Sequence, residues 1–513
     1  MFKKILIANR GEIALRVVCA CRELGIRTVA IYSEADRNSL HVRFADEAIC
    51  IGPPRLAESY LNIPAVISTA EICNADAIHP GYGLLSENAN FAEVCETSGI
   101  KFIGPPPEIT RLMGEKEKAR AAMKRAGVPI VPGSDGVVAN EGEALEWARS
   151  IGFPVIVKAT AGGGGRGMRI IREEREVAGQ FLQAQSEAQA AFGNGDLYLE
   201  KFIENPRHIE FQVLGDVYGK VISLGERECS IQRRHQKVME ESPSTFVNAE
   251  MRRHMGELAV RVAQAAGYTN AGTVEFLCDQ DKTFYFLEMN TRLQVEHPVT
   301  EFVTGLDLVH LQIHIAAGEK LPFRQEDIRL RGHAIECRIY AEDPDHNYFP
   351  SPGKITLLIA PSGPGLRRDS GMYEGWTVPV DYDPLLAKLI AYGTDREQCI
   401  GRLLRGLSEY MIGGIKTNLS LFRRILEHPE FRAGHLDTDF LDRLLQEGPV
   451  ALARDEEGAQ IAALAAGIFM AVDATAGSPA GVNNSLNGLG PGNPATGRSG
   501  WKQAGRVEAM KPL

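Results

Sequence analysis

The stretch Phe153-Pro-Val-Ile-Val-Lys-Ala-Thr-Ala-Gly-Gly-Gly-Gly-Arg-Gly-Met168 decides the fold class, because a glycine-rich loop here joins two short apolar segments. We expect a strand over Pro154–Ala159, which carries Lys158, and a second strand over Met168–Ile171. Glycines let backbone N–H groups approach phosphate oxygens without a Cβ in the way, and Lys158 supplies a positive charge. A flexible linker is the alternative, but a linker would not be framed tightly by two apolar strands.

This loop differs from the common phosphate-binding loop of the Walker A type. No Gly-Lys-Ser or Gly-Lys-Thr follows it, and the next element has the pattern of a strand rather than a helix. The stretch therefore predicts a phosphate-binding loop that joins two strands.

Upstream, residues 1–113 alternate short apolar runs with helical periodicity, which predicts a parallel, doubly wound sheet. No Gly-x-Gly-x-x-Gly follows the first strand, so the dinucleotide-binding fingerprint is absent. The expected strands are Lys4–Ala8, Thr28–Tyr32, Ala48–Ile51, Ala75–Ile78 and Lys101–Ile103, and the expected helices are Glu12–Leu24, Pro64–Cys73 and Ala89–Ser98.

Downstream, the pattern changes three times. Residues 114–325 open with a helix, Glu115–Ala126, and then show period-two alternation that predicts antiparallel sheets. Residues 330–446 begin with a strand, His333–Tyr340, and end in helices over Arg396–Ile412 and Asn418–Leu426. In residues 447–513, a short apolar helix at about 456–474 precedes a Gly-, Pro-, Asn- and Ser-rich segment that we expect to be mostly disordered. The fold class is thus α/β combined with α+β.

Composition excludes several classes of protein. The 513 residues suggest about three domains, and 56 Lys and Arg against 66 Asp and Glu argue against a nucleic-acid scaffold. The nine cysteines form no Cys-x-x-Cys pair, which indicates reduced thiols. We find no targeting segment at the N-terminus and no apolar stretch of the roughly 20 residues that a bilayer span needs. We therefore expect a cytoplasmic protein without membrane contact.

A second informative stretch, Gly272–Asn290, has the pattern of a β-hairpin. A two-residue turn at Asp281-Lys282 would place Glu275 opposite Glu288, with Asn290 on the same face. Two facing carboxylates repel, and a hard cation such as Mg²⁺ between them would remove the repulsion and bridge nucleotide phosphates. Solvent-facing glutamates are the alternative, which the apolar neighbours disfavour.

Polar residues follow this hairpin directly, in Thr291-Arg-Leu-Gln-Val-Glu-His-Pro298. Arg292 could clamp a small oxyanion, and Glu296 could act as a general base. Alone, such a run is more often a solvated loop, but its place after the paired carboxylates favours a site.

Three other features have competing interpretations. The basic cluster Arg233, Arg234, His235 and Lys237 lacks interleaved aromatic residues, so a small anionic ligand is favoured over nucleic acid. His310 and His314 lack the glutamate of a zinc-protease motif, and we interpret them as packing residues. Glu508-Ala-Met-Lys511 is similar to a biotin-accepting sequence, but Pro512 replaces the expected Met, and we do not expect Lys511 to accept biotin.

Four stretches together resemble biotin carboxylase, the ATP-grasp component of biotin-dependent carboxylases. They are Ile7–Ala14, His79–Asn88, Lys158 with its glycine loop, and Glu288–Pro298. The resemblance covers about residues 1–446. It implies an ATP-grasp fold with a Rossmann-like pre-ATP-grasp domain (1–113), an ATP-grasp domain (114–325) with a mobile lid at about 131–203, and a mixed α+β C-terminal domain (330–446).

The resemblance also implies roles for individual residues. The nucleotide-binding positions are Lys116, Lys158, Gly163, Gly164, Gly165, Arg166, Gly167, Glu200, Lys201, Phe202, Ile203, His208, Gln232 and His235, and the Mg²⁺ or Mn²⁺ ligands are Glu275, Glu288 and Asn290. Lys237, Arg292, Gln294 and Val295 match the bicarbonate site, Glu296 matches the base that deprotonates bicarbonate, and Arg338 matches the residue that steadies the biotin enolate.

The implied reaction is ATP- and bicarbonate-dependent carboxylation of biotin on a biotin carboxyl carrier protein through carboxyphosphate. The implied context is acetyl-CoA carboxylase and fatty acid synthesis, with carboxyltransferase subunits as partners and a homodimer as the assembly. A propionyl-CoA or pyruvate carboxylase stays open, as does another ATP-grasp carboxylate–amine ligase, which would not need Glu296 or Arg338. A nucleotide-binding regulatory subunit is the non-enzyme alternative, and the intact Lys237, Arg292 and Glu296 argue against it.

Overall fold

The computed structural model describes residues 1–160, 167–448, 460–461 and 463–468, without the side chains of residues 116, 117 and 345. The chain divides into two units, Met1–Gly448 and Pro449–Leu513. In the second unit the described residues, 460–461 and 463–468, are helical, in agreement with the apolar helix expected there. The rest of the predicted disordered segment lies outside the described residues.

The first sheet of the larger unit is the predicted parallel sheet. Its strand order is β3-β2-β1-β4-β5, and every neighbouring pair is parallel. The strands are β1 (Lys4–Ile7), β2 (Arg27–Ser33), β3 (Glu47–Gly52), β4 (Ala77–His79) and β5 (Lys101–Phe102), and the helices are α1 (Gly11–Glu23), α2 (Leu40–Phe44), α3 (Ile63–Ile72), α4 (Ala89–Thr97) and α5 (Pro107–Gly114).

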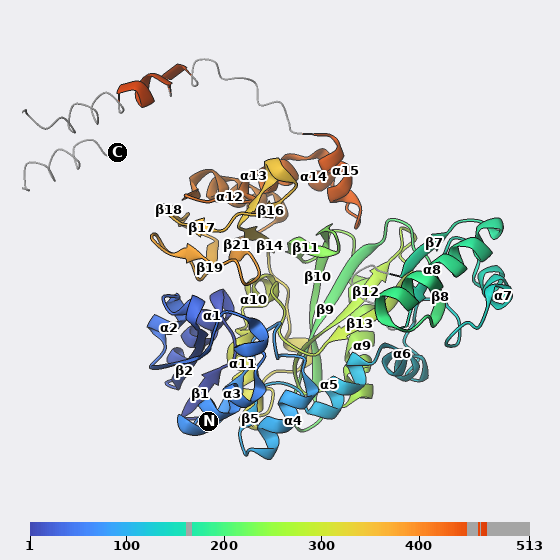
Figure 1. Ribbon diagram of the computed structural model, residues 1–513, viewed down its shortest axis with the longest axis horizontal. Coiled ribbons are helices and arrows are strands. Elements are labelled where there is room, and N and C mark those ends of the chain that lie inside the picture. Colours follow the sequence, from blue (N-terminus) through green and yellow to red (C-terminus); the bar gives the residue numbers. More distant parts are fainter. Residues whose placement is uncertain (161–166, 449–459, 462, 469–513) are drawn as a thin grey trace, which may run out of the picture. The chain divides into compact units, whose positions relative to one another are not determined.

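The glycine-rich loop belongs to a small three-stranded sheet of order β7-β6-β8, drawn in green beside α7 and α8 in Figure 1. Both neighbouring pairs are antiparallel, as the period-two alternation within residues 114–325 predicts. Apolar side chains of β6 and β8 pack on the two helices, and this layer has a hydrophobic core of its own. The elements are α6 (Lys116–Arg125), α7 (Glu141–Ile151), β6 (Val155–Ala159), β7 (Met168–Ile171), α8 (Val177–Phe192) and β8 (Leu197–Lys201).

The largest sheet has eight strands in the order β13-β12-β9-β10-β11-β14-β21-β19, and its neighbours are antiparallel. It continues across the boundary expected near residue 330, so the second and third regions share one sheet. The elements are β9 (Arg207–Gly215), β10 (Val221–Arg233), β11 (Gln236–Ser242), α9 (Ala249–Ala266), β12 (Asn270–Cys278), β13 (Phe284–Asn290), α10 (His297–Thr304), α11 (Leu308–Ala316), β14 (His333–Tyr340), β19 (Leu366–Ser370) and β21 (Leu385–Gly393).

The remaining elements correct one prediction. The helix expected over Arg396–Ile412 ends at Glu409, because Met411–Gly413 form strand β22, which pairs with β18. Gly414 then adopts a φ of 90°, which a helix cannot accommodate. The elements are β15 (Glu342–Asp343), β16 (Phe349–Pro350), β17 (Gly353–Lys354), β18 (Leu357–Ile359), β20 (Thr377–Val378), α12 (Arg396–Glu409), β22 (Met411–Gly413), α13 (Leu419–Glu427), α14 (Pro429–Ala433) and α15 (Phe440–Gln446).

Two hydrophobic clusters hold the large sheet in place. Helix α9 packs on one face through residues such as Met255 and Val262. A second cluster joins Val17 of α1 to Leu214 of β9 and Ile313 of α11, so the parallel sheet and the large sheet share buried apolar surface. This packing fixes the loops at the carboxyl ends of the parallel strands relative to the large sheet. Among the described residues, no helix combines the length and apolarity that crossing a bilayer requires.

Candidate active site

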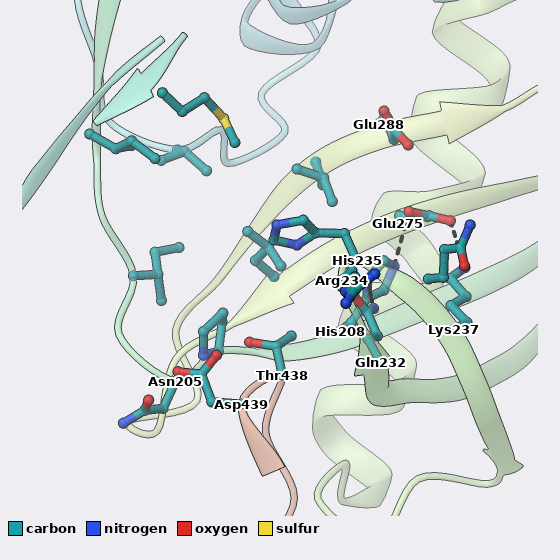
Figure 2. A pocket seen from close by; sticks show the side chains of 18 of the residues that line it. Asn205, His208, Gln232, Arg234, His235, Lys237, Glu275, Glu288, Thr438 and Asp439 are labelled. Carbon is teal, nitrogen blue, oxygen red and sulfur yellow. Dashed lines mark hydrogen bonds and ion pairs between the residues drawn. The ribbon is translucent and has the colours of Figure 1, made fainter. Parts of the chain in front are cut away.

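A cavity of about 1100 Å³ opens between the small sheet of β6, β7 and β8 and the large sheet. Its walls come from both sheets, from the segment after β13 and from residues near α15, and Figure 2 shows part of this lining. Seventeen of the site residues implied by the resemblance line it together: Lys158, Glu200, Lys201, Phe202, Ile203, His208, Gln232, His235, Lys237, Glu275, Glu288, Asn290, Arg292, Gln294, Val295, Glu296 and Arg338.

The other named positions do not line this cavity in the part of the chain that is described. Gly163, Gly164, Gly165 and Arg166 lie outside the described residues, as does the side chain of Lys116. Gly167 directly precedes β7 and has a φ of 68°, and its carbonyl accepts a hydrogen bond from Ala159 N–H at 3.0 Å. A Cβ at Gly167 would approach that of Ala159 to 3.0 Å, so the end of the loop needs glycine for both conformation and space.

The hairpin of β12 and β13 places Glu275 opposite Glu288, as predicted, but through a different loop. The expected two-residue turn is wrong. The loop has three residues, 280–282, between Asp279 and Thr283, and Lys282 adopts a φ of 64° within it. This loop shifts the pairing by one residue, so Cys278 pairs with Phe284. A β-bulge between Glu275 and Phe276 shifts the pairing back. The two shifts cancel, and the carboxylates face each other.

Glu275 is buried and surrounded by donors. Its Oε1 accepts hydrogen bonds from Lys237 Nζ at 2.9 Å, and from the side-chain amides of Asn290 and Gln294 at 2.8 Å each. Its Oε2 lies 2.9 Å from Nε2 of His208. Burial opposes ionisation, but the charges of Lys237 and His208 hold the pKa of Glu275 well below its usual value. The repulsion expected across the hairpin is therefore already offset by a lysine.

The donor set around this hairpin suits a hard divalent cation. Glu288 is exposed to the cavity, Asn290 is half-buried, and both lie on β13, which pairs with the strand that carries Glu275. Carboxylate and amide oxygens are the ligands that Mg²⁺ and Mn²⁺ prefer. Glu275, Glu288 and Asn290 thus fit the metal ligands expected from the sequence.

Glu296 is buried between two cations. Its Oε1 accepts from Lys237 Nζ at 2.8 Å, and its Oε2 accepts from a terminal nitrogen of Arg338 at 2.9 Å. Burial alone would raise the pKa of this carboxyl, but Lys237, Arg338 and Arg227 lower it below its usual value. Glu296 is therefore ionised and can accept a proton once other anions share the neighbouring positive charge.

Arg227 is a residue that the sequence analysis did not select. Its guanidinium is fully buried, and all three of its nitrogens donate hydrogen bonds. The acceptors are Glu210, Gln212 Oε1 at 2.7 Å, Thr300 Oγ1 at 3.0 Å, Thr273 Oγ1 at 3.1 Å and Gln294 Oε1 at 2.8 Å. Glu210 in turn accepts from Lys237 Nζ at 2.5 Å. Arg227 thereby orients two side chains that line the cavity, Gln294 directly and Lys237 through Glu210.

Arg292 also has an unexpected partner. Its Nε donates to Oε2 of Glu87 at 2.8 Å, and a terminal nitrogen donates to Asn290 Oδ1 at 3.1 Å. Glu87 belongs to the stretch His79–Asn88, which follows strand β4. This contact joins the parallel sheet to the segment after β13. The sequence analysis had selected the stretch His79–Asn88 but not Glu87 within it.

A second cluster of charged side chains lines the cavity on the side of β6 and β8. Lys158 Nζ lies 2.6 Å from Oε2 of Glu200, and Arg120 pairs with the other oxygen of Glu200. Lys201 Nζ donates to the carbonyls of Gly152 and Phe153 at 3.0 and 2.9 Å. Lys158 and Arg120 both direct positive charge into the cavity, as a site for a phosphorylated ligand requires.

The turn between β10 and β11 explains the place of His235. Arg234 and His235 have φ values of 51° and 64°, which is the pattern of a two-residue type I′ turn. Neither residue is a glycine, so the turn stores local strain at the rim of the cavity. Further in, Gln232 Nε2 lies 2.9 Å from Nδ1 of His208.

A second, smaller cavity of about 340 Å³ shares five lining residues with the first: Arg292, Val295, Arg338, Tyr340 and Asp383. Its other walls include the loop after β4, with Tyr82 and Gly83, and the aromatic ring of Tyr382. The loop at the carboxyl end of β4 therefore does face a cavity, as open parallel sheets favour.

The two histidines interpreted as packing residues have other contacts. His310 Nε2 lies 3.1 Å from a carboxylate oxygen of Glu23, and His314 Nδ1 lies 2.8 Å from Glu319. Both rings are half-buried on α11. Each half-buried ring is thus partly packed and also lies beside a carboxylate.

Comparison with known proteins places these features in a family. Residues 1–110 match the family described as biotin carboxylase, N-terminal domain, residues 115–324 match the ATP-binding domain of the carbamoyl-phosphate synthase L chain, and residues 336–443 match the biotin carboxylase C-terminal domain.

Individual relatives agree with this assignment. A biotin carboxylase from Nostoc sp. is 58% identical over 443 residues, which cover 86% of this chain and 99% of the relative. One of the pyruvate carboxylase subunits of Methanothermobacter thermautotrophicus is 54% identical over 442 residues, covering 86% and 90%. The biotin carboxylase domain of the Hydrogenobacter thermophilus 2-oxoglutarate carboxylase, solved as a dimer with MgADP, ADP and bicarbonate, superposes with a TM-score of 0.81 at 50% identity and covers 88% and 99%.

Proposed function

The chain belongs to the biotin carboxylase family and is an ATP-dependent ligase with an ATP-grasp domain, and from this premise we propose that it carboxylates biotin on a carrier protein. ATP and bicarbonate are the other substrates, and carboxyphosphate is the intermediate. One observation carries the proposal: Lys237 and Arg338 both donate to Glu296 in the same cavity as the paired glutamates of the hairpin.

In this proposal the nucleotide lies between the small sheet, which is the expected lid, and the large sheet. Lys158 and the end of the glycine loop at Gly167 approach the phosphates, while His208, Gln232 and His235 line the side away from the lid. Glu275, Glu288 and Asn290 would hold Mg²⁺ or Mn²⁺, which supplies charge neutralisation at the β- and γ-phosphates. The positive charges of Lys158 and Arg120 support this orientation of the phosphates.

Bicarbonate occupies the neighbouring end of the cavity. Lys237, Arg292 and the amide of Gln294 converge there and can hold an oxyanion. Glu296 takes the proton of bicarbonate, whose oxygen then attacks the γ-phosphorus as ADP leaves. The incoming anion shares Lys237 with Glu296, so the basicity of Glu296 rises when bicarbonate is bound.

Biotin enters from the smaller cavity. Tyr82 and Tyr382 offer aromatic walls for an apolar bicyclic ring, and Arg338 lies where the two cavities meet. Carboxyphosphate releases CO₂ and phosphate, the phosphate takes the ureido N–H proton, and the resulting enolate attacks CO₂. Arg338 stabilises the negative charge that develops on the ureido oxygen.

We further propose acetyl-CoA carboxylase, which feeds malonyl-CoA into fatty acid synthesis, as the context of this chain, with a carrier protein, carboxyltransferase subunits and a second copy as partners. Relatives named for pyruvate carboxylase and for 2-oxoglutarate carboxylase are similar over most of the chain, so the acyl acceptor could also be pyruvate or a related acid. Purification with the native carrier tests this choice: the biotinylated protein that co-purifies, and its carboxyltransferase, identify the acceptor.

The central experiment measures ATP hydrolysis by the purified chain with Mg²⁺. We expect hydrolysis to depend on bicarbonate and to rise when free biotin is added, with formation of carboxybiotin. Another ATP-grasp ligase would show no stimulation by biotin, and a regulatory nucleotide-binding subunit would show no hydrolysis. Either result would contradict the proposed function.

A further inference from the structure

Lys388 is a fully buried lysine in the middle of strand β21 that the proposed reaction does not use. A lysine is almost never fully buried unless its charge is paired. Its Nζ donates to the backbone carbonyl of Val295 at 2.8 Å and lies 3.4 Å from a carboxylate oxygen of Glu12. Asp369 on β19 is 3.7 Å away, and the ring of Tyr82 is centred at 5.8 Å.

These contacts join three parts of the chain at one ammonium group. Glu12 lies in the first turn of α1, Val295 lies in the segment after β13, and Lys388 and Asp369 belong to neighbouring strands of the large sheet. Neither oxygen of Glu12 has a hydrogen-bond partner among the described residues, and Glu12 is buried. Its pairing with Lys388 is therefore chiefly electrostatic, and the directed bond of Lys388 is the one to Val295.

The hydrogen bond from Lys388 matters because Val295 lies between two residues of the proposed bicarbonate site. Residues 291–296 form no helix or strand, so their positions depend on contacts made by individual groups. The side chain of Gln294 is held by Arg227, and that of Glu296 by Lys237 and Arg338. Among the described residues, Lys388 is the one whose side chain donates to the carbonyl of Val295, between Gln294 and Glu296.

We propose that Lys388 is a positioning residue, which fixes the backbone at Val295 so that Gln294 and Glu296 meet bicarbonate in the reactive geometry. The inference rests on the proposed function, because it assigns a cause to the placement of the same site. A group held on a segment without regular structure gains precision from such a buried donor. Lys388 itself touches neither ATP nor bicarbonate, since it does not line the large cavity.

The test replaces Lys388 with methionine, which retains the length of the side chain and removes the donor. We expect the KM for bicarbonate to rise about tenfold or more, because one hydrogen bond to a buried carbonyl is lost. The KM for ATP should stay within about twofold, since the nucleotide residues lie on other strands. Amide hydrogen exchange without substrates should become faster in residues 291–299 than in strand β12.

Lys4→Met is the matched control. Lys4 Nζ donates to the carbonyl of Cys73 at 2.6 Å and pairs with Glu47 at 2.8 Å, so the same two kinds of contact are lost at the amino end of β1 in the parallel sheet. This control should change neither the KM for bicarbonate nor the exchange of residues 291–299.

A second variant covers the case in which Lys388→Met does not fold. Glu12→Gln together with Lys388→Met removes the opposing charge, and we expect it to fold and to show the same separation of the two KM values. An unchanged KM for bicarbonate, or an equal rise in both KM values, would overturn the proposal. Failure of the double variant to fold would also overturn it, by assigning Lys388 to stability alone. An inactive unmodified chain would instead contradict the proposed function.

Discussion

Arg338 donates a hydrogen bond of 2.9 Å to the same carboxylate, Glu296, that we propose as the base for bicarbonate. The cation assigned to biotin and the base assigned to bicarbonate are therefore in direct contact before either substrate is bound. Lys237 holds the other oxygen of Glu296 at 2.8 Å. Each substrate that draws one of these cations away leaves Glu296 a stronger base, so the two half-sites are coupled through one carboxylate.

Replacement of Glu296 by glutamine tests the base directly. The change keeps the size of the side chain and removes its ability to accept the proton, so we expect carboxylation to fall by about 10²- to 10⁴-fold. Binding of ATP, measured by calorimetry, should stay near that of the unmodified chain. Glu257→Gln, at an exposed ion pair with Arg253, is the control. A comparable loss of ATP affinity in Glu296→Gln would show that the role is misassigned.

Replacement of Glu288 by glutamine tests the metal site. Glu288 is exposed to the cavity and faces Glu275, so the change removes one anionic ligand with little effect on the fold. We expect the Mg²⁺ concentration for half-maximal ATP hydrolysis to rise about tenfold or more, because ligand charge sets the affinity of such sites. Titration with Mg²⁺ at saturating ATP measures it, and an unchanged midpoint would remove Glu288 from the set of ligands.

The hairpin shows how far the sequence could predict the site. The residue pattern predicted both strands. The pairing of Glu275 with Glu288 was predicted from a two-residue turn, and it holds because the longer loop and the bulge cancel. The loop length was wrong by one residue, and the compensating bulge had no signal in the sequence. Turn type depends on backbone conformations such as the positive φ of Lys282, which residue identity alone does not determine.

The buried charged residues that support the site, such as Arg227, could not have been predicted from residue patterns. Arg227 lies in the run Glu226-Arg-Glu228, whose composition is typical of a solvent-exposed segment, yet all three residues are buried beneath the cavity. Their burial depends on side-chain partners from distant segments: Arg227 donates to Thr273, Gln294 and Thr300. Arg252 on α9 neutralises Glu226. Periodicity identifies which residues share a face, whereas partners between distant elements appear only in the folded chain.

The hydrogen bonds of Arg227 lead to a prediction for Arg227→Lys. A lysine keeps the charge but offers at most three donors in place of five, so Gln294 loses its fixed orientation. We expect the KM for bicarbonate to rise about tenfold, with the KM for ATP within about twofold. Steady-state kinetics with each substrate varied in turn measures this. Arg253→Lys, at an exposed ion pair on α9, should leave both values unchanged.

The acid stability of the chain should depend on Glu241, which accepts from Arg396 at 2.7 Å and lies 2.6 Å from His333. Burial alone would raise its pKa, but Arg396 and His333 lower the pKa to about 2, against an ordinary value near 4.3. This pairing therefore stabilises the fold above the ordinary pKa, and the contribution is lost as the pH falls toward 2.

Glu241→Gln should accordingly lower the free energy of unfolding at pH 7 by roughly 2–4 kcal/mol, and the difference from the unmodified chain should shrink below pH 4. Urea unfolding at pH 7, 4 and 3 measures both effects. A difference that stays constant over this range would show that the carboxylate charge is not the source of the stabilisation.

Arg338→Lys separates the two half-sites. Lysine preserves a positive charge near Glu296 and Glu240. It lacks the planar set of donors with which a guanidinium can bind a carboxylate and an enolate oxygen at the same time. We expect bicarbonate-dependent ATP hydrolysis without biotin to persist within about tenfold, because Lys237 still holds Glu296, whereas carboxylation of biotin falls about 100-fold or more. Lys237→Arg is the comparison, and it should reduce both activities, since Lys237 contacts Glu296, Glu275 and Glu210. If Arg338→Lys reduced both activities equally, Arg338 would belong to the bicarbonate half-site, and the assignment of the smaller cavity to biotin would lose its main support.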